Sequence, residues 1–245
     1  MSLIFDTISI AREGRSIVRD VSFAIPRGEL HILMGQNGSG KSTLLNGSMG
    51  YPSHTISRGK ILLDGEDVTG FPTEEKAKKG LFLSPQNPPA IPGVPLASFL
   101  YKASSALHGT AESALDFYAR AESIAEQFGL DAMLLKRPVH EGLSGGEKKH
   151  AELIQLAILE PKFAMLDEID SGLDRDSLRL VFKTIDAFRK RGMGFLVVTH
   201  YDTILDISAP DAVHVMYGGK IVRSGGTDLA REIKEQGYTQ LVCKK

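Results

Sequence analysis

Hydrophobic residues alternate with polar ones in two segments near the start of the chain. Over residues 3–10, Leu3, Phe5, Ile8 and Ile10 are apolar at mostly alternating positions, which is typical of a half-buried strand. Residues 18–25 predict a second strand. Short apolar runs predict further strands over residues 29–34, 60–63, 81–83, 163–166, 195–199 and 212–217. Asp64 and Gly65 directly follow one of these runs and indicate a hairpin.

Helical spacing dominates the remaining segments. We expect helices over residues 73–79, 96–107, 111–128, 145–159, 175–191 and 227–236, and one that begins near Lys41. Strands and helices alternate from residue 145 onward, which predicts a parallel sheet with crossover helices. Residues 87–95 are rich in proline and are expected to lack regular structure. We therefore expect an α/β core formed by residues 1–87 and 140–245, with a helical subdomain, residues 88–139, inserted in it.

Composition restricts the function classes. A chain of 245 residues with 42% hydrophobic and 24% charged residues is typical of a globular protein. Its net charge of −1 gives no electrostatic case for binding nucleic acid or an anionic membrane. The beginning of the chain lacks the pattern of a signal peptide, and no apolar run is long enough for direct membrane insertion, so we expect a cytoplasmic protein. The single cysteine, Cys243, predicts that no iron–sulfur cluster is held by this chain.

The segment 35–43 fits G-x-x-x-x-G-K-[ST], the phosphate-binding loop, and follows an expected strand. Glycines let successive N–H groups point at an anion, Lys41 adds a positive charge, and Ser42 offers a hydroxyl to Mg²⁺. A dinucleotide fingerprint is the weaker alternative, because its third glycine is missing. We therefore predict a site for ATP and Mg²⁺. Its phosphate-binding residues are Gly35, Asn37, Gly38, Ser39, Gly40, Lys41, Ser42 and Thr43.

Two carboxylates, Asp167 and Glu168, end a short apolar run. In a parallel sheet, side chains at the carboxyl end of a strand face the ligand crevice. Asp167 is predicted to hold Mg²⁺, and Glu168 to orient and polarise the water that attacks the γ-phosphate. The alternative is a pair of solvated acids that closes a strand, and the upstream phosphate loop makes the catalytic interpretation stronger.

The sequence Leu-Ser-Gly-Gly-Glu over residues 143–147 precedes an expected helix. Ser144 can cap this helix with Glu147 as its capping-box partner. Gly145 and Gly146 would also leave the helix N-terminus open to a phosphate. This motif, between the phosphate loop and the acidic strand end, is the signature of the ATP-binding-cassette (ABC) ATPases, which the chain resembles over essentially its whole length. The resemblance implies a P-loop core with a mostly parallel sheet, N-terminal antiparallel strands and an inserted helical lobe.

The same resemblance implies roles for further residues. Gln86 matches the glutamine that touches Mg²⁺ and the attacking water, Asp174 matches the D-loop, and His200 matches the switch histidine near the γ-phosphate. Two subunits would sandwich two ATP molecules, so the signature residues Ser144, Gly145, Gly146 and Glu147 would contact ATP bound to the other subunit. Many members stack an aromatic residue on adenine. Residues 10–14 contain none, and Arg12 is either a stacking residue or a solvated one.

Several segments resemble a narrower group, the SufC ATPases of the Suf iron–sulfur cluster assembly system. They are residues 86–94, 144–149, 167–174, 199–201 and 210–215, with Asp170 and Tyr201 as the most telling positions. Ala90 and His150 depart from the pattern. This resemblance implies an ATP-dependent homodimer that drives a conformational change in a SufB/SufD-type scaffold. Residues 88–95 are the candidate docking surface, and the alternative is a rigid loop in contact with solvent.

Three alternatives or additions remain open from the sequence. The chain could be the ATPase subunit of a membrane ABC transporter, which shares every nucleotide motif. It could also bind ATP only to dimerise, although Glu168 and His200 argue against that. Finally, Lys148 or Lys149 could pair with Glu168 in the isolated subunit and keep basal hydrolysis low, or both could be solvated helix residues.

Overall fold

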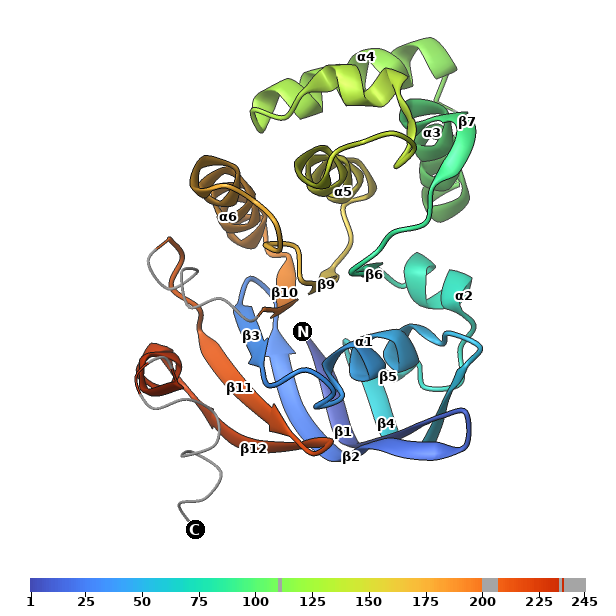
Figure 1. The fold of residues 1–245 in the computed structure, drawn as a ribbon. Helices are drawn as coiled ribbons and strands as arrows, with labels where there is room; N and C mark the ends of the chain where they lie inside the picture. Colours follow the sequence, from blue (N-terminus) through green and yellow to red (C-terminus); the bar gives the residue numbers. More distant parts are fainter. Residues whose placement is uncertain (110–111, 200–206, 234, 236–245) are drawn as a thin grey trace.

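A mostly parallel sheet forms the centre of the molecule in the computed structural model, which describes residues 1–109, 112–199, 207–233 and 235 (Figure 1). Its strand order is β12-β11-β3-β10-β9-β6. The neighbouring pairs are parallel except β11–β12, which is antiparallel. The strands are β3 (Leu30–Met34), β6 (Leu81–Ser84), β9 (Phe163–Asp167), β10 (Gly194–Val198), β11 (Ala212–Tyr217) and β12 (Lys220–Gly225).

A second, antiparallel sheet is built from the N-terminal part of the chain, in the order β2-β1-β4-β5. Its strands are β1 (Ser2–Arg12), β2 (Arg15–Pro26), β4 (His54–Leu63) and β5 (Glu66–Asp67). The hairpin expected at Asp64 and Gly65 joins β4 to β5. The expected fold class, α/β with a mostly parallel sheet and N-terminal antiparallel strands, is therefore confirmed. β4 begins earlier than the hydrophobic pattern predicted, and β12 was not predicted at all.

Helix α1 (Lys41–Met49) lies between the two sheets. Its buried residues Leu44 and Leu45 belong to one hydrophobic cluster with Ile8 of β1 and Leu196 of β10. Burial from both sides fixes the axis of this helix, because apolar area removed from water stabilises the packing by about 25 cal/mol per Å². The N-terminus of α1, where the phosphate loop ends, is positioned in this way.

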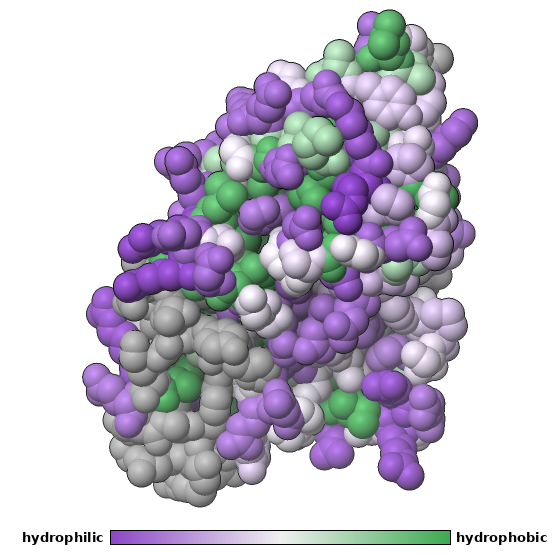
Figure 2. Space-filling model, turned by 45° about the horizontal axis from the view of Figure 1, so that its top comes forward, coloured by the Kyte–Doolittle hydropathy of each residue, from purple (hydrophilic) through white to green (hydrophobic). Residues whose placement is uncertain are grey.

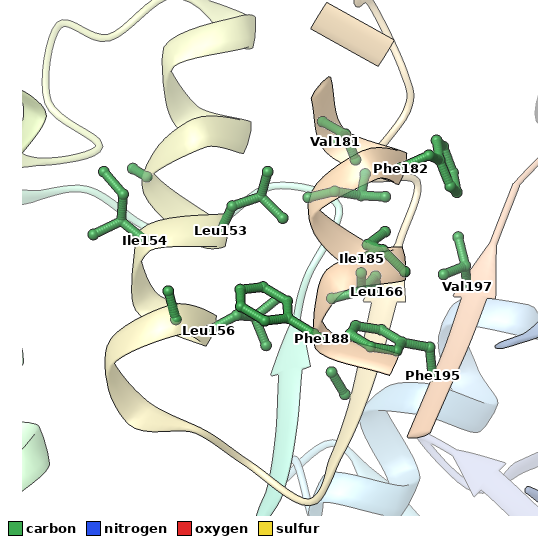
Figure 3. Close-up of a cluster of buried hydrophobic side chains, with 14 of the residues drawn as sticks. Leu153, Ile154, Leu156, Leu166, Val181, Phe182, Ile185, Phe188, Phe195 and Val197 are labelled. Carbon is green, nitrogen blue, oxygen red and sulfur yellow. The ribbon is translucent and has the colours of Figure 1, made fainter. Parts of the chain in front are cut away.

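The opposite face of the parallel sheet is covered by α5 (Gly145–Leu159) and α6 (Arg175–Lys190). Figure 3 shows Leu153 and Leu156 of α5 directed toward α6, with Phe188 of α6 beside Leu156. Phe195 of β10 closes the same cluster from the sheet. This packing holds α5 against the sheet and thereby fixes the position of the segment that begins at Ser144.

The remaining helices are α2 (Thr73–Lys78), α3 (Leu96–His108), α4 (Ala114–Gln127) and the 3₁₀ turn η1 (Ala132–Lys136), and residues 227–233 are also helical. α3, α4 and η1 gather around α5 through Leu100, Phe117, Ala121 and Leu134 (Figure 1). A helical part thus lies between β6 and α5 in the chain. Its exact boundaries at residues 88 and 139 stay a prediction.

The expectation that the proline-rich segment 87–95 lacks regular structure holds for residues 87–90 and was wrong for residues 91–95. Residues Ile91–Pro95 form β7, which pairs antiparallel with β8 (Pro138–Val139) in a small separate sheet. Proline has no N–H group that could donate a hydrogen bond to a neighbouring strand. A short strand in a two-stranded sheet, however, needs only a few N–H donors to pair with its neighbour. Here the ladder begins at Ile91, opposite Val139, and Gly93 N donates to the Glu141 carboxylate at 3.1 Å.

On the face in Figure 2, hydrophobic residues form small groups bordered by hydrophilic ones. Among the described residues, no helix is both long and apolar enough to cross a bilayer.

Candidate functional site

The phosphate loop connects β3 to α1, as its spacing predicted. Gly38 and Gly40 have φ values of +79° and +110°, a region that side chains disfavour, so glycine is required for this curl. Lys41 is the first residue of α1 and is 6% exposed. Its Nζ donates to the carbonyl oxygens of Gly35 at 2.8 Å and Gln36 at 3.1 Å. The ammonium group is therefore held over its own loop.

The β11–β12 hairpin packs against this loop, a contact that the sequence did not predict. A Cβ atom added to Gly35 would lie 2.3 Å from the carbonyl oxygen of Met216. Gly219 N also donates to Ser39 O at 2.9 Å. The loop thus rests on backbone that lies about 180 residues later in the chain, and the Gly218-Gly219 pair was the one local signal of a turn there.

Asp167 ends β9 beside the start of α1, and it is 2% exposed. Burial raises the pKa of its carboxyl group, while a hydrogen bond with Ser42 and the charge of Lys41 act against that rise. One carboxylate oxygen, Oδ1, has no hydrogen-bond partner among the described residues. Burial also lowers the pKa of Lys41, opposed by the charges of Glu168 and Asp167. Mg²⁺ prefers oxygen ligands, and a buried carboxylate oxygen beside a hydroxyl provides them. The side chains of Asp167 and Ser42 therefore fit Mg²⁺.

Glu168 has the geometry of a strained functional residue. Its φ is +54°, which costs about 1–3 kcal/mol for a side chain of this kind. Its N–H donates to Val198 O at 3.0 Å, and Lys149 Nζ donates to its carbonyl oxygen at 3.0 Å. Gln86 Nε2 donates to its carboxylate oxygen Oε2 at 2.6 Å. The structure thus brings Gln86 and Glu168 together from positions 82 residues apart.

Lys149 contacts Glu168 through the main chain. Lys149 is 5% exposed, so it is not the solvated residue that the sequence left open, and its Nζ donates to the carbonyl oxygen of Glu168. Lys149 therefore supports the strained backbone turn at Glu168. Burial lowers the pKa of Lys149, opposed by the surrounding acids.

A cavity of about 580 Å³ joins these elements. Its lining comprises Arg12, Ile17, Asn37, Gly38, Gly40, Lys41, Ser42, Thr43, Gln86 and Glu168. Six of the eight predicted phosphate-binding residues, all except Gly35 and Ser39, and two of the predicted catalytic residues therefore face one space. Arg12 and Ile17 come from the antiparallel sheet, and sequence reasoning considered only Arg12.

The signature residues lie outside this lining. Ser144 caps α5 through its Oγ, which accepts from Glu147 N at 3.3 Å, and Glu147 Oε2 accepts from Ser144 N at 2.7 Å. The predicted capping box is thus confirmed. Ser144 and Gly145 are exposed, and a Cβ on Gly145 would meet nothing within 4 Å. The helix N-terminus is open to a ligand from outside the chain.

Two further predicted positions lie near the turn after β9. Asp174 caps α6, with its carboxylate accepting from Ser177 N at 2.8 Å, a structural role that sequence reasoning missed. Asp170 is 4% exposed and accepts a hydrogen bond from the Thr199 hydroxyl, which links this turn to the end of β10. The predicted switch histidine, His200, and Cys243 lie outside the described residues.

A glycine-rich loop at the start of a helix, beside an acidic strand end in a mostly parallel sheet, defines a P-loop nucleoside triphosphatase. The sequence model of the family "ABC transporter" matches residues 18–171. Vegetative protein 296 of Bacillus subtilis is 42% identical, with 97% of this chain and 92% of that protein aligned. A probable ATP-dependent transporter of Synechocystis is 42% identical, with coverages of 96% and 94%.

Solved structures agree at the level of the fold. The ATP-binding subunit of an ABC transporter superimposes with a TM-score of 0.81 at 23% identity, covering 98% of this chain and 99% of that one. This chain belongs to the ABC transporter family of ATP-binding proteins, and within that family it is an ATPase.

Proposed function

We propose that this chain hydrolyses ATP with the predicted residues in the following roles. Lys41 and the loop N–H groups hold the β- and γ-phosphates, and Ser42, Asp167 and Gln86 hold Mg²⁺, which neutralises developing charge on the phosphates. Glu168 polarises the attacking water, and His200 contacts the γ-phosphate. The observation that supports this best is the 2.6 Å contact between Gln86 and Glu168 at the mouth of the phosphate loop.

The signature would act on ATP bound to a second copy, with Asp174 at the subunit boundary. Ser144 and Gly145 present an exposed helix N-terminus that does not line the cavity of its own chain. Such a terminus stabilises an anion only if another molecule brings the anion to it. Two copies related by a two-fold axis would give each ATP one phosphate loop and one signature.

We further propose that the ATPase drives a SufB/SufD-type iron–sulfur cluster assembly scaffold, with the cluster held by the partners. The support is the resemblance of residues 86–94, 144–149 and 167–174 to the SufC group, together with the strand pairing of the proposed docking segment. β7 pairs with β8, and β8 lies five residues before Ser144. A partner that moves β7 would therefore move the segment that leads into the signature.

The second candidate is the ATPase subunit of a membrane transporter. The names of several relatives favour it, since the Synechocystis protein is called a probable ATP-dependent transporter. Both candidates use the same nucleotide chemistry and differ in the protein bound to the helical part.

Affinity purification of the tagged full-length chain from its own cells, without cross-linking, separates the candidates. A SufB/SufD-type scaffold in the eluate supports cluster assembly, and a membrane permease in its place refutes it. Pro92→Glu in β7 should abolish recovery of the partner, while Pro52→Glu, an equally exposed proline outside the segment, should leave it unchanged. Recovery that is equal for the two variants would contradict docking on β7.

Phosphate release tests the catalytic roles. Glu168→Gln should lower kcat at least 100-fold with ATP affinity within about threefold, because it removes a proton acceptor and keeps the shape. It should also accumulate an ATP-bound dimer in size-exclusion chromatography with light scattering. A Glu168→Gln variant as active as the wild type would refute the assignment.

A further inference from the structure

Lys76 is a buried lysine that the nucleotide chemistry does not use. It lies on α2, is 0% exposed, and its Nζ donates a hydrogen bond to Ser48 O at 2.8 Å. Among the described residues, no carboxylate forms an ion pair with it. Burial of an ammonium group without a counter-ion costs free energy, and this burial lowers the pKa of Lys76. The charge therefore needs another source of stabilisation.

The carboxyl end of α1 provides that stabilisation. The last four carbonyl groups of a helix lack partners within the helix, and in α1 they belong to residues 46–49. All four accept hydrogen bonds: Asn46 O from Tyr51 N, Gly47 O from Gly50 N, Ser48 O from Lys76 Nζ, and Met49 O from Thr73 Oγ1. Of these four donors, Lys76 alone carries a charge. It lies at the negative end of the helix dipole, where a cation is favoured.

The same helix begins at the phosphate loop. Lys41 is its first residue, and the residues of α1 after Lys41 are uncharged. Leu44 and Leu45 are buried against both sheets, so water and salt screen a charge along this helix less than they would at the surface. Residues 41–48 rise about 10 Å, which places the Lys76 ammonium group roughly 16 Å from a phosphate bound at the helix N-terminus.

We propose that Lys76 raises the affinity of the phosphate loop for a triphosphate by holding a positive charge at the carboxyl end of α1. This role rests on the proposed phosphate-binding role of the loop. At roughly 16 Å and an effective dielectric constant of about 20, one unit charge changes the dissociation constant of a singly charged anion about fivefold. Lys76 does not line the nucleotide cavity, so it is a positioning residue that acts through α1.

Titration calorimetry of the full-length chain with Mg-ATP, Mg-ADP and inorganic triphosphate tests this role. Lys76→Met keeps the length of the side chain without its charge. It should weaken Mg-ATP and inorganic triphosphate about fivefold or more, and Mg-ADP by a smaller factor, since Mg-ADP carries less negative charge. Lys76→Arg retains the charge and should bind within about twofold of the wild type. In phosphate release, Lys76→Met should raise KM and leave kcat within about twofold, because Gln86 and Glu168 are unchanged.

Two matched variants separate the charge from the capping of α1. Thr73→Val removes the neutral donor to Met49 O and should lower the melting temperature while Mg-ATP binds within about twofold of the wild type. Lys78→Met removes a charge from an exposed position of the same helix, where water screens it, and should bind like the wild type. An affinity loss in Thr73→Val equal to that in Lys76→Met would overturn the proposal, because lost capping would then explain both.

Lys41→Ala distinguishes failure of this inference from failure of the proposed phosphate site. If Lys41→Ala loses Mg-ATP affinity while Lys76→Met binds like the wild type, the role of Lys76 is refuted and the phosphate site stands. If Lys41→Ala also binds like the wild type, both are refuted. Lys76→Met is expected to fold, because an apolar side chain of similar volume often replaces a buried charge without loss of stability. Lys76→Gln, a second neutral variant, should reproduce the affinity loss, and wild-type affinity in Lys76→Gln would contradict the role of the charge.

Discussion

A buried pair of histidines should make the stability of this protein fall below neutral pH. His31 of β3 and His214 of β11 are each 4% exposed, and His31 Nδ1 lies 3.0 Å from His214 Nε2. His31 Nε2 contacts Glu29 Oε2 at 2.9 Å, and His214 Nδ1 contacts Ser224 Oγ at 2.8 Å. One arrangement of protons satisfies the whole chain. Ser224 donates to His214, His214 donates to His31, and His31 donates to Glu29, with both rings neutral.

A second proton on His214 would place a buried positive charge beside His31. Burial, together with the nearby His31, lowers the pKa of His214 from 6.5 to about 4. The folded state favours neutral His214. The contribution of this residue to the free energy of unfolding is therefore complete above pH 6.5 and is lost as the pH falls toward 4. With those two pKa values, the loss between pH 7.5 and pH 5 is about 2 kcal/mol.

Urea unfolding at several pH values between 7.5 and 5 measures this loss. His214→Gln, which is uncharged and keeps a donor and an acceptor, should be less stable than the wild type at pH 7.5. Between pH 7.5 and pH 5, however, the free energy of unfolding of His214→Gln should decrease by about 2 kcal/mol less than that of the wild type. His108→Gln, at an exposed position of α3, is the matched control. Parallel curves for His214→Gln and the wild type would refute the argument.

Three further predictions concern single contacts. Phe188→Ala should lower the free energy of unfolding by about 3–5 kcal/mol in urea titration, because the ring is 2% exposed between α5 and α6; a loss below 1 kcal/mol would contradict this packing. Asp174→Ala should cost about 1 kcal/mol by loss of the α6 cap, and Asp174→Asn should recover most of it. Gly35→Ala should weaken ATP binding at least tenfold in calorimetric titration, because its Cβ would lie 2.3 Å from Met216 O, whereas Gly70→Ala, with open space, should bind normally.

Local chemistry with fixed spacing was readable from the sequence. The strand, loop and helix around Lys41 follow from an apolar run, glycines with positive φ and a helix start. The capping box at Ser144 is similarly local, since both of its hydrogen bonds join residues three apart. Such features depend on neighbours along the chain, so composition and spacing were sufficient to predict them.

Pairing between distant segments was not readable in the same way. The prolines around Ile91 argued against a strand, but Val139, 48 residues later, supplies the partner that makes one. The hairpin after Met216 shapes the phosphate loop only because the sheet places β11 beside β3. Periodicity describes which face of a segment is buried and carries no information about the segment that covers it.

The amino-acid pattern alone therefore predicted a site for ATP and the loop expected to hold its phosphates. The surroundings of that loop became known only from the folded chain: Gln86 donates to the Glu168 carboxylate, Lys149 donates to the Glu168 carbonyl oxygen, and Ile17 lines the cavity. A phosphate loop is specified by backbone conformation within nine residues. The surroundings of the predicted catalytic carboxylate, Glu168, and the lining of the cavity depend on side chains that meet only when the two sheets pack against α1.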